Sequence, residues 1–71
     1  TTFSFNLSTR SFVSLIVFDL RGREVATIVS GLYPAGDYFR QWDASNISSG
    51  VYFYRLLAGT LIETKKLVLL K

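Results

Sequence analysis

The chain has 71 residues, of which 49% are hydrophobic and none is cysteine or histidine. This composition excludes a disulfide-stapled fold and argues against metal or cofactor sites, so a domain this small must gain its stability from a dense apolar core. The net charge of +3 comes from scattered basic residues, unlike a nucleic-acid-binding face, and apolar runs such as "LIVF" are far shorter than the about 20 residues of a membrane span.

The first predicted strands show alternating apolar and polar residues. Residues 2–8 place Phe3, Phe5 and Leu7 on one face, which is typical of a strand with one buried side. Residues 11–19, "SFVSLIVFD", place one apolar set on one face and a second, largely apolar set on the other. The first set is Val13, Leu15 and Val17, and the second is Phe12, Ser14, Ile16 and Phe18. We therefore expect this strand to be central, or its second face to meet something outside the domain.

Turn signals then separate four further segments. "DLRGRE" (19–24) predicts a hairpin into a strand at 24–31, with Gly22 free to take a positive φ. "YPAGD" (33–37) predicts a second turn, in which Pro34 fixes φ and Gly36 can adopt a left-handed conformation. Strands are expected at 37–43 and 51–59, joined by a polar loop over 44–50.

The last segment follows a tight reversal at 59–60 and runs over 61–71 as one strand or a strand pair. Its "LVLL" is expected to pair with the first strand or with "VYFYRLL", at a burial gain of about 3–6 kcal/mol. Six or seven short strands without a helix predict an all-β fold, a small Ig-like antiparallel β-sandwich.

Aromatic residues gather in the second half of the chain. Trp42, Phe39 and "YFY" (52–54) could stack on sugars or nucleobases, but alternation favours a core role. The expected core is Val13, Leu15, Val17, Trp42, Tyr52, Tyr54 and Leu56. Arg40 and Arg55 are expected to lay their stems along apolar surface.

Catalysis is not expected. The carboxylates fall in or beside turns, where they bond backbone N–H groups, and no serine lies in a nucleophile-elbow motif. Asn6 and Asn46 each begin a glycosylation triplet, but the structural role of an Asn in a strand or turn is the favoured interpretation.

Three motifs in a fixed order carry a family resemblance: "VFDLRGREVATIV", "PAGDY…WDASNISSGVYFYRL" and "ETKKLVLLK". Together they resemble the type A C-terminal sorting domain of the type IX secretion system of Bacteroidota, an Ig-like sandwich. "GREV" and "WD…SGVY" are also similar to the Ig-like domain of a flagellar hook-capping protein. Because the chain begins with Thr1 rather than Met, we expect it to be excised from or processed out of a longer exported protein.

The resemblance implies a secretion signal that carries cargo through the periplasm and an outer-membrane translocon to the cell surface. Its implied partners are the secretion machinery, a sortase-like peptidase and an upstream cargo domain; no nucleic-acid partner is expected, because the basic residues are scattered. The residues implied in translocon recognition are Gly22, Arg23, Glu24, Pro34, Gly36, Gly50, Tyr52, Lys65, Lys66, Leu67, Val68, Leu69, Leu70 and Lys71.

The terminal strand offers a physical means of recognition. An exposed β-edge could bind a receptor by strand addition, in which case a proline at Val68 should abolish binding. Ile16, Tyr33 and Arg40 depart from the usual family pattern. The extra apolar surface leaves a structural Ig-like module that self-associates through edge strands, as a filament or other homo-oligomer, as the alternative function.

Overall fold

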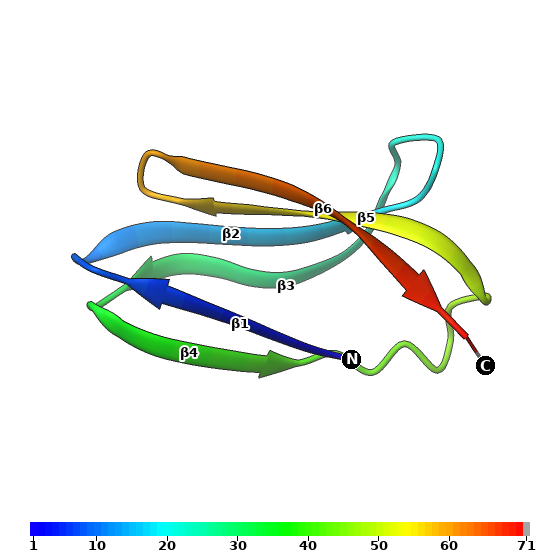
Figure 1. Ribbon diagram of the computed structural model, residues 1–71, viewed down its shortest axis with the longest axis horizontal. Helices are drawn as coiled ribbons and strands as arrows, with labels where there is room; N and C mark the ends of the chain where they lie inside the picture. Colours follow the sequence, from blue (N-terminus) through cyan, green and yellow to red (C-terminus); the bar gives the residue numbers. More distant parts are fainter. Residues whose placement is uncertain (71) are drawn as a thin grey trace.

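The computed structural model describes residues 1–70 and shows, over that range, six strands in two antiparallel sheets and no helix (Figure 1). The predicted all-β, two-sheet class is confirmed. The strands are β1 (Thr2–Leu7), β2 (Ser11–Phe18), β3 (Glu24–Tyr33), β4 (Gly36–Gln41), β5 (Gly50–Ala58) and β6 (Leu61–Leu69).

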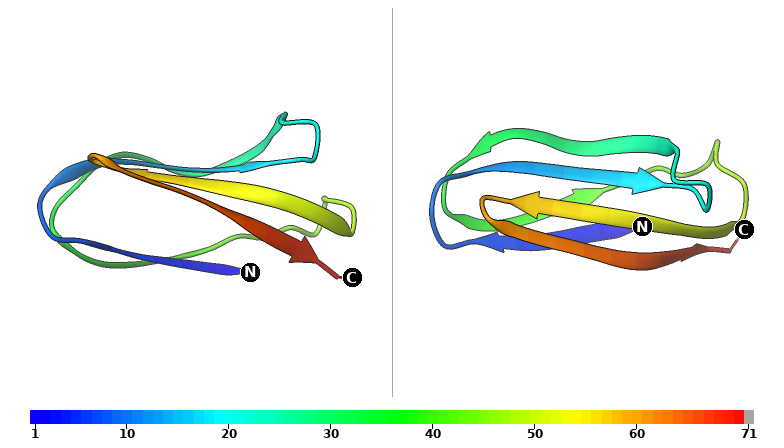
Figure 2. Two further views of the ribbon diagram at one scale, coloured as in Figure 1. Left: turned by 45° about the horizontal axis from the view of Figure 1, so that its top comes forward. Right: turned by 90° about the horizontal axis from the view of Figure 1, so that it is seen from above.

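The two sheets differ in size. Four strands pair in the order β3-β2-β5-β6, while β1 and β4 form a separate two-stranded sheet. Figure 2 shows that the smaller sheet lies against one side of the larger one, which leaves the other side of the larger sheet uncovered. The chain crosses between sheets over residues 8–10, 34–35 and 42–49.

The core lies between the two sheets. On β2, Val13, Leu15 and Val17 are almost fully buried because this strand has a neighbour on both edges. On β1, the alternation seen in the sequence turns Phe3, Phe5 and Leu7 inward. Each such burial contributes about 1.5–3 kcal/mol, which is a large share of the stability of so small a domain. The buried set is Phe3, Phe5, Leu7, Val13, Leu15, Val17, Val29, Tyr52, Leu56 and Leu69.

The expected aromatic group is divided by the alternation of the strands. Tyr52 is buried, and Trp42 and Tyr54 are half-buried against the core, where Phe3 meets the Tyr54 ring edge-on with centroids 5.0 Å apart. Phe53 and Phe39 point outward from the two sheets and are 37% and 68% exposed. The five rings therefore form no single stacking platform.

The predicted boundaries shift most at β3 and β4, and β4 ends at Gln41 rather than at residue 43. β3 continues to Tyr33 because its ladder with β2 extends to the pair Ser11↔Tyr33, so only Pro34 and Ala35 separate β3 from β4. The final segment is one strand, and of the two expected partners for it, β5 is confirmed.

The end of that strand corrects the prediction for "LVLL". Leu69 is buried and Leu67 packs partly on the core, but Val68 is 50% and Leu70 is 89% exposed. Alternate residues of a strand point to opposite faces, and Leu70 lies beyond the last pair of the ladder, so only part of the motif is core. Lys71 lies outside the described residues.

Candidate functional site: the β6 edge and the adjoining end of the sandwich

β6 forms one free edge of the larger sheet. Its nine residues pair with β5 in an unbroken register from Ala58↔Leu61 to Gly50↔Leu69. The opposite edge, β3, is interrupted by two register shifts against β2. Bulges of this kind twist an edge strand away from pairing, so β6 is the more regular of the two edges for the addition of another strand.

The direction of the β6 backbone groups follows from its hairpin. Gly59, at φ 63°, opens a two-residue reversal before Leu61, and its N–H donates to the Phe12 carbonyl at 3.1 Å. The odd-numbered residues of β5 therefore bond to β2, and the even-numbered ones bond to β6. It follows that Leu61, Glu63, Lys65, Leu67 and Leu69 bond inward to β5. The N–H and C=O groups that face outward belong to Ile62, Thr64, Lys66 and Val68.

Lys65 and Lys66 lie on opposite faces of β6. Lys65 Nζ lies 3.0 Å from Glu63 Oε1, and this hydrogen bond together with the Glu63 charge raises the pKa of Lys65 above its ordinary value. Lys66 lies on the outward face, opposite Phe53 of β5. The two lysines therefore form no single cationic patch, and each flanks the edge from its own side.

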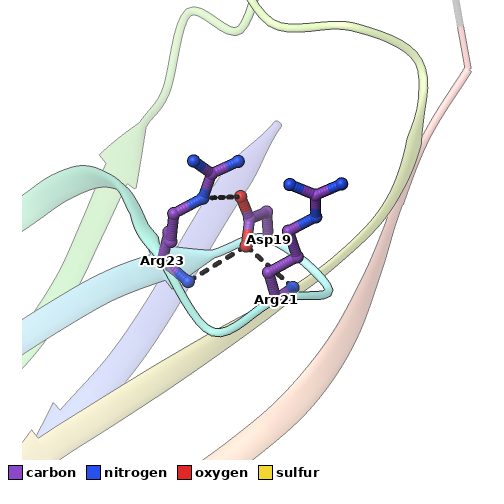
Figure 3. Close-up of polar contacts among 3 residues, drawn as sticks. All are labelled: Asp19, Arg21 and Arg23. Carbon is purple, nitrogen blue, oxygen red and sulfur yellow. Dashed lines mark hydrogen bonds and ion pairs between the residues drawn. The ribbon is translucent and has the colours of Figure 1, made fainter.

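The β2–β3 turn is built on Asp19 (Figure 3). Asp19 Oδ1 accepts hydrogen bonds from the backbone N–H groups of Arg21 at 2.9 Å and Arg23 at 3.0 Å, and Arg23 Nε lies 3.4 Å from Oδ2. The Arg23 N–H bond is the largest cause that lowers the pKa of Asp19 below its ordinary value. Gly22 completes the turn at φ 83°, as predicted, and leaves the Arg21 and Arg23 side chains exposed.

This turn lies beside the start of β5 and the end of β6. Residues 19–21, Arg23 and residues 49–52 together line an open hollow of about 260 Å³, and Gly50 pairs with Leu69. The Tyr52 hydroxyl donates to the Ser48 carbonyl at 2.7 Å and so holds the loop before β5. Figure 1 shows the turn, the start of β5 and the C-terminal end of β6 at the same end of the sandwich.

The remaining candidates lie elsewhere. Pro34 and Gly36 stand at the opposite end, where the chain passes from β3 to β4, and the Tyr38 hydroxyl donates to the Pro34 carbonyl at 2.6 Å. Arg40 reaches over the rings of Tyr33 and Tyr38, with its guanidinium carbon 5.5 and 5.6 Å from their centroids. The structure thus brings the turn 22–24, residues 50–52 and the end of β6 together, but not Pro34 and Gly36.

The sequence prediction missed how much of the outward face of β5 and β6 is apolar. Val51 lies there opposite Val68, and Leu57 lies opposite Ile62, while Phe53 lies between these two pairs, opposite Lys66. Period-two alternation in both segments was the available signal, but the register between the strands was needed to place these side chains on one surface.

Comparison with known proteins identifies a family. The model of the secretion system C-terminal sorting domain matches residues 1–70. No curated protein and no solved structure matches the chain. Within residues 1–70, no three metal-ligating side chains of the His, Cys, Asp or Glu type come together, and no helix is long and apolar enough to cross a membrane.

Proposed function

Because the chain belongs to the secretion system C-terminal sorting domain family, we propose that it carries an attached cargo through the type IX outer-membrane translocon. A sorting tail of this kind implies export to the cell surface or secretion. Passage through the periplasm, removal by a sortase-like peptidase and a cargo domain upstream of Thr1 are further parts of the proposal. In this role the domain is a substrate of the machinery and not an enzyme.

The observation that carries the proposal is the family match over 1–70, and the geometry of the β6 end supports recognition at that end. β6 is a regular free edge, and its C-terminal end adjoins the β2–β3 turn, which carries Arg21 and Arg23, and the Gly50–Tyr52 segment. We propose that the machinery adds a strand along β6, bonding to the outward groups of Thr64, Lys66 and Val68. The lysines discourage pairing between two β6 edges, since like charges would meet.

The test is export of a periplasmic reporter fused in front of residues 1–71 in a host with a working type IX system. Three tails are compared: the intact end, an end without residues 65–71, and the intact end followed by a polar extension. The shortened tail loses the buried Leu69 and is expected to unfold as well as to lose export. The extended tail keeps the whole ladder, so it separates folding from recognition of the end.

Surface display by the intact fusion, and its loss with both altered tails, is the expected result. Protease resistance of the domain reports folding in each fusion. If the intact fusion is folded and still remains in the periplasm, the sorting function is wrong for this chain. Display with the extended tail would instead overturn the part of the proposal in which the end of β6 must be free.

A further inference from the structure

The outward face of the four-stranded sheet carries most of the large apolar side chains that are exposed within residues 1–70. We call this surface the outer face: the side chains of β3, β2, β5 and β6 that point away from β1 and β4. Among residues 1–70, nine large apolar side chains are exposed, and six of them lie on or at the end of this face. They are Phe12, Leu20, Leu32, Phe53, Ile62 and Val68. A gathering of exposed apolar side chains on one face is typical of an interaction site.

One row across the outer face has charges of opposite sign at its two ends. Register pairs place Glu24 of β3 beside Phe18 of β2, Phe18 beside Phe53 of β5, and Phe53 beside Lys66 of β6. Glu24 is on this face because its Oε1 accepts a hydrogen bond from the Thr27 hydroxyl at 3.1 Å, and Thr27 pairs with outward-facing Ile16. The row therefore reads acid, aromatic, aromatic, base.

We propose that a second copy of this chain covers the outer face, related to the first by a two-fold axis parallel to the strands. Such an axis reverses the strand order, so that β6 of one copy lies over β3 of the other and β5 lies over β2. Lys66 of each copy then faces Glu24 of the other copy, so this ion pair forms twice. Phe18 of each copy packs on Phe53 of the other copy. The row is complementary to itself in this arrangement alone.

The charges decide between the two ways of stacking the sheets. A two-fold axis perpendicular to the strands would place β6 over β6 and β5 over β5. Lys66 would then face Lys66 if the axis crossed this row, and Arg55 would face Arg55 if it crossed the neighbouring one. The Arg55 guanidinium carbon lies over the Phe18 ring, 5.1 Å from its centroid, so this charge lies on the outer face over the two central strands, β2 and β5. Like charges opposite each other are destabilising, so the parallel axis is favoured.

The size of the face indicates a weak dimer. Four strands about 4.8 Å apart and about eight residues of 3.3 Å each give a plan area of roughly 500 Å² per copy. Two such faces bury about 1,000 Å² in total, at the lower limit for a specific interface, so association should depend on concentration. The β6 edge stays free in this arrangement, and the dimer therefore does not depend on the proposed sorting function or compete with it.

Sedimentation equilibrium of purified residues 1–71, up to millimolar concentration, tests the proposal. The charge-reversed variants Lys66→Glu and Glu24→Lys each place like charges together, and each is expected to weaken the dimer at least about tenfold. Mixing the two variants should restore association, because positions 66 and 24 then carry opposite charges in both facing pairs of the mixed dimer. Lys65→Glu, on the opposite face of β6, is the matched control and should leave the dimer unchanged.

All three positions are exposed, so circular dichroism should show an unchanged fold in every variant. A dimer that is weakened by each single reversal and restored on mixing supports the proposal. A chain that is monomeric throughout the range overturns it. So does a dimer that ignores both reversals or that Lys65→Glu weakens equally, because a different surface would then hold the copies together.

Discussion

The outward faces of the two sheets have opposite chemistry. On the two-stranded sheet the outward side chains are polar except Phe39, and Asn6 donates from Nδ2 to Asp37 Oδ1 across the strands at 2.6 Å. On or at the end of the outer face of the four-stranded sheet lie six of the nine exposed large apolar side chains of residues 1–70, although β1 and β4 cover only the other side (Figure 2). A face that needs only water can be polar throughout, so the difference favours the larger sheet as the side of the contact that we propose.

The largest predicted effect comes from comparing a buried residue on the inner side of the larger sheet with an exposed residue on the outer side of the smaller sheet. Leu15→Ala removes a side chain that is 1% exposed and leaves a cavity, at an expected cost of about 2–5 kcal/mol. Phe39→Ala removes a larger side chain that is 68% exposed, and the expected change is within about 0.5 kcal/mol. Urea unfolding of both variants measures the difference; equal costs would contradict the assignment of the faces.

The next comparison is between two neighbouring residues at the end of the chain. Leu69→Ala should lower the free energy of unfolding by about 2–3 kcal/mol, because Leu69 is buried opposite Gly50. Leu70→Ala should have almost no effect, since Leu70 is 89% exposed and lies outside the ladder. Thermal unfolding followed by circular dichroism checks both. A destabilised Leu70→Ala would mean that the last residue of "LVLL" is part of the core after all.

Proline substitution sharpens the distinction between the inward and outward groups of β6. Leu67→Pro deletes an N–H that bonds to β5 and is expected to cost about 1–3 kcal/mol. Val68→Pro deletes an outward N–H, which edge strands tolerate, so its cost should be clearly smaller. Amide hydrogen exchange across the β5–β6 ladder distinguishes the two, and stronger disruption by Val68→Pro would reverse the assigned hydrogen-bond pattern.

The smallest predicted effect concerns pH and the β2–β3 turn. The pKa of Asp19 is lower in the folded state than its ordinary value of 3.8, so this carboxylate stabilises the fold at pH values above that value. The contribution is lost as the pH falls through the lower folded pKa. Asp19→Asn should therefore reduce the loss of stability on acidification below about pH 4. Chemical unfolding at neutral and acidic pH measures the loss of stability on acidification. An equal loss in the wild-type chain and in Asp19→Asn would contradict the electrostatics assigned to the turn.

The sequence predicted the strands better than it predicted their partners. Alternation at Phe3, Phe5 and Leu7, and at Val13, Leu15 and Val17, identified the inner faces because a strand with one buried side must alternate. Which strands belong to which of the two sheets could not be predicted, since pairings such as Phe5↔Tyr38 join distant segments. Local composition also could not show that Leu69 is inside and Leu70 outside, because register with β5 decides it.

The same limit applies to the candidate site. The motifs singled out the turn 22–24, residues 50–52 and the last strand one by one, but only the fold shows that they adjoin and that Pro34 and Gly36 do not. The relation to the hook-capping Ig-like domain stays a prediction.

The central claim is that the secretion machinery recognises the free edge of β6. Surface display of a reporter fused to two proline variants of the domain tests this claim most directly. Val68→Pro blocks the outward N–H of β6. Ser4→Pro blocks an outward N–H of β1, because Trp42 N–H donates to the Thr1 carbonyl and this fixes the alternation along β1. With both domains shown to be folded, we expect display to be lost with Val68→Pro and kept with Ser4→Pro. Normal display of the Val68→Pro fusion would contradict the claim.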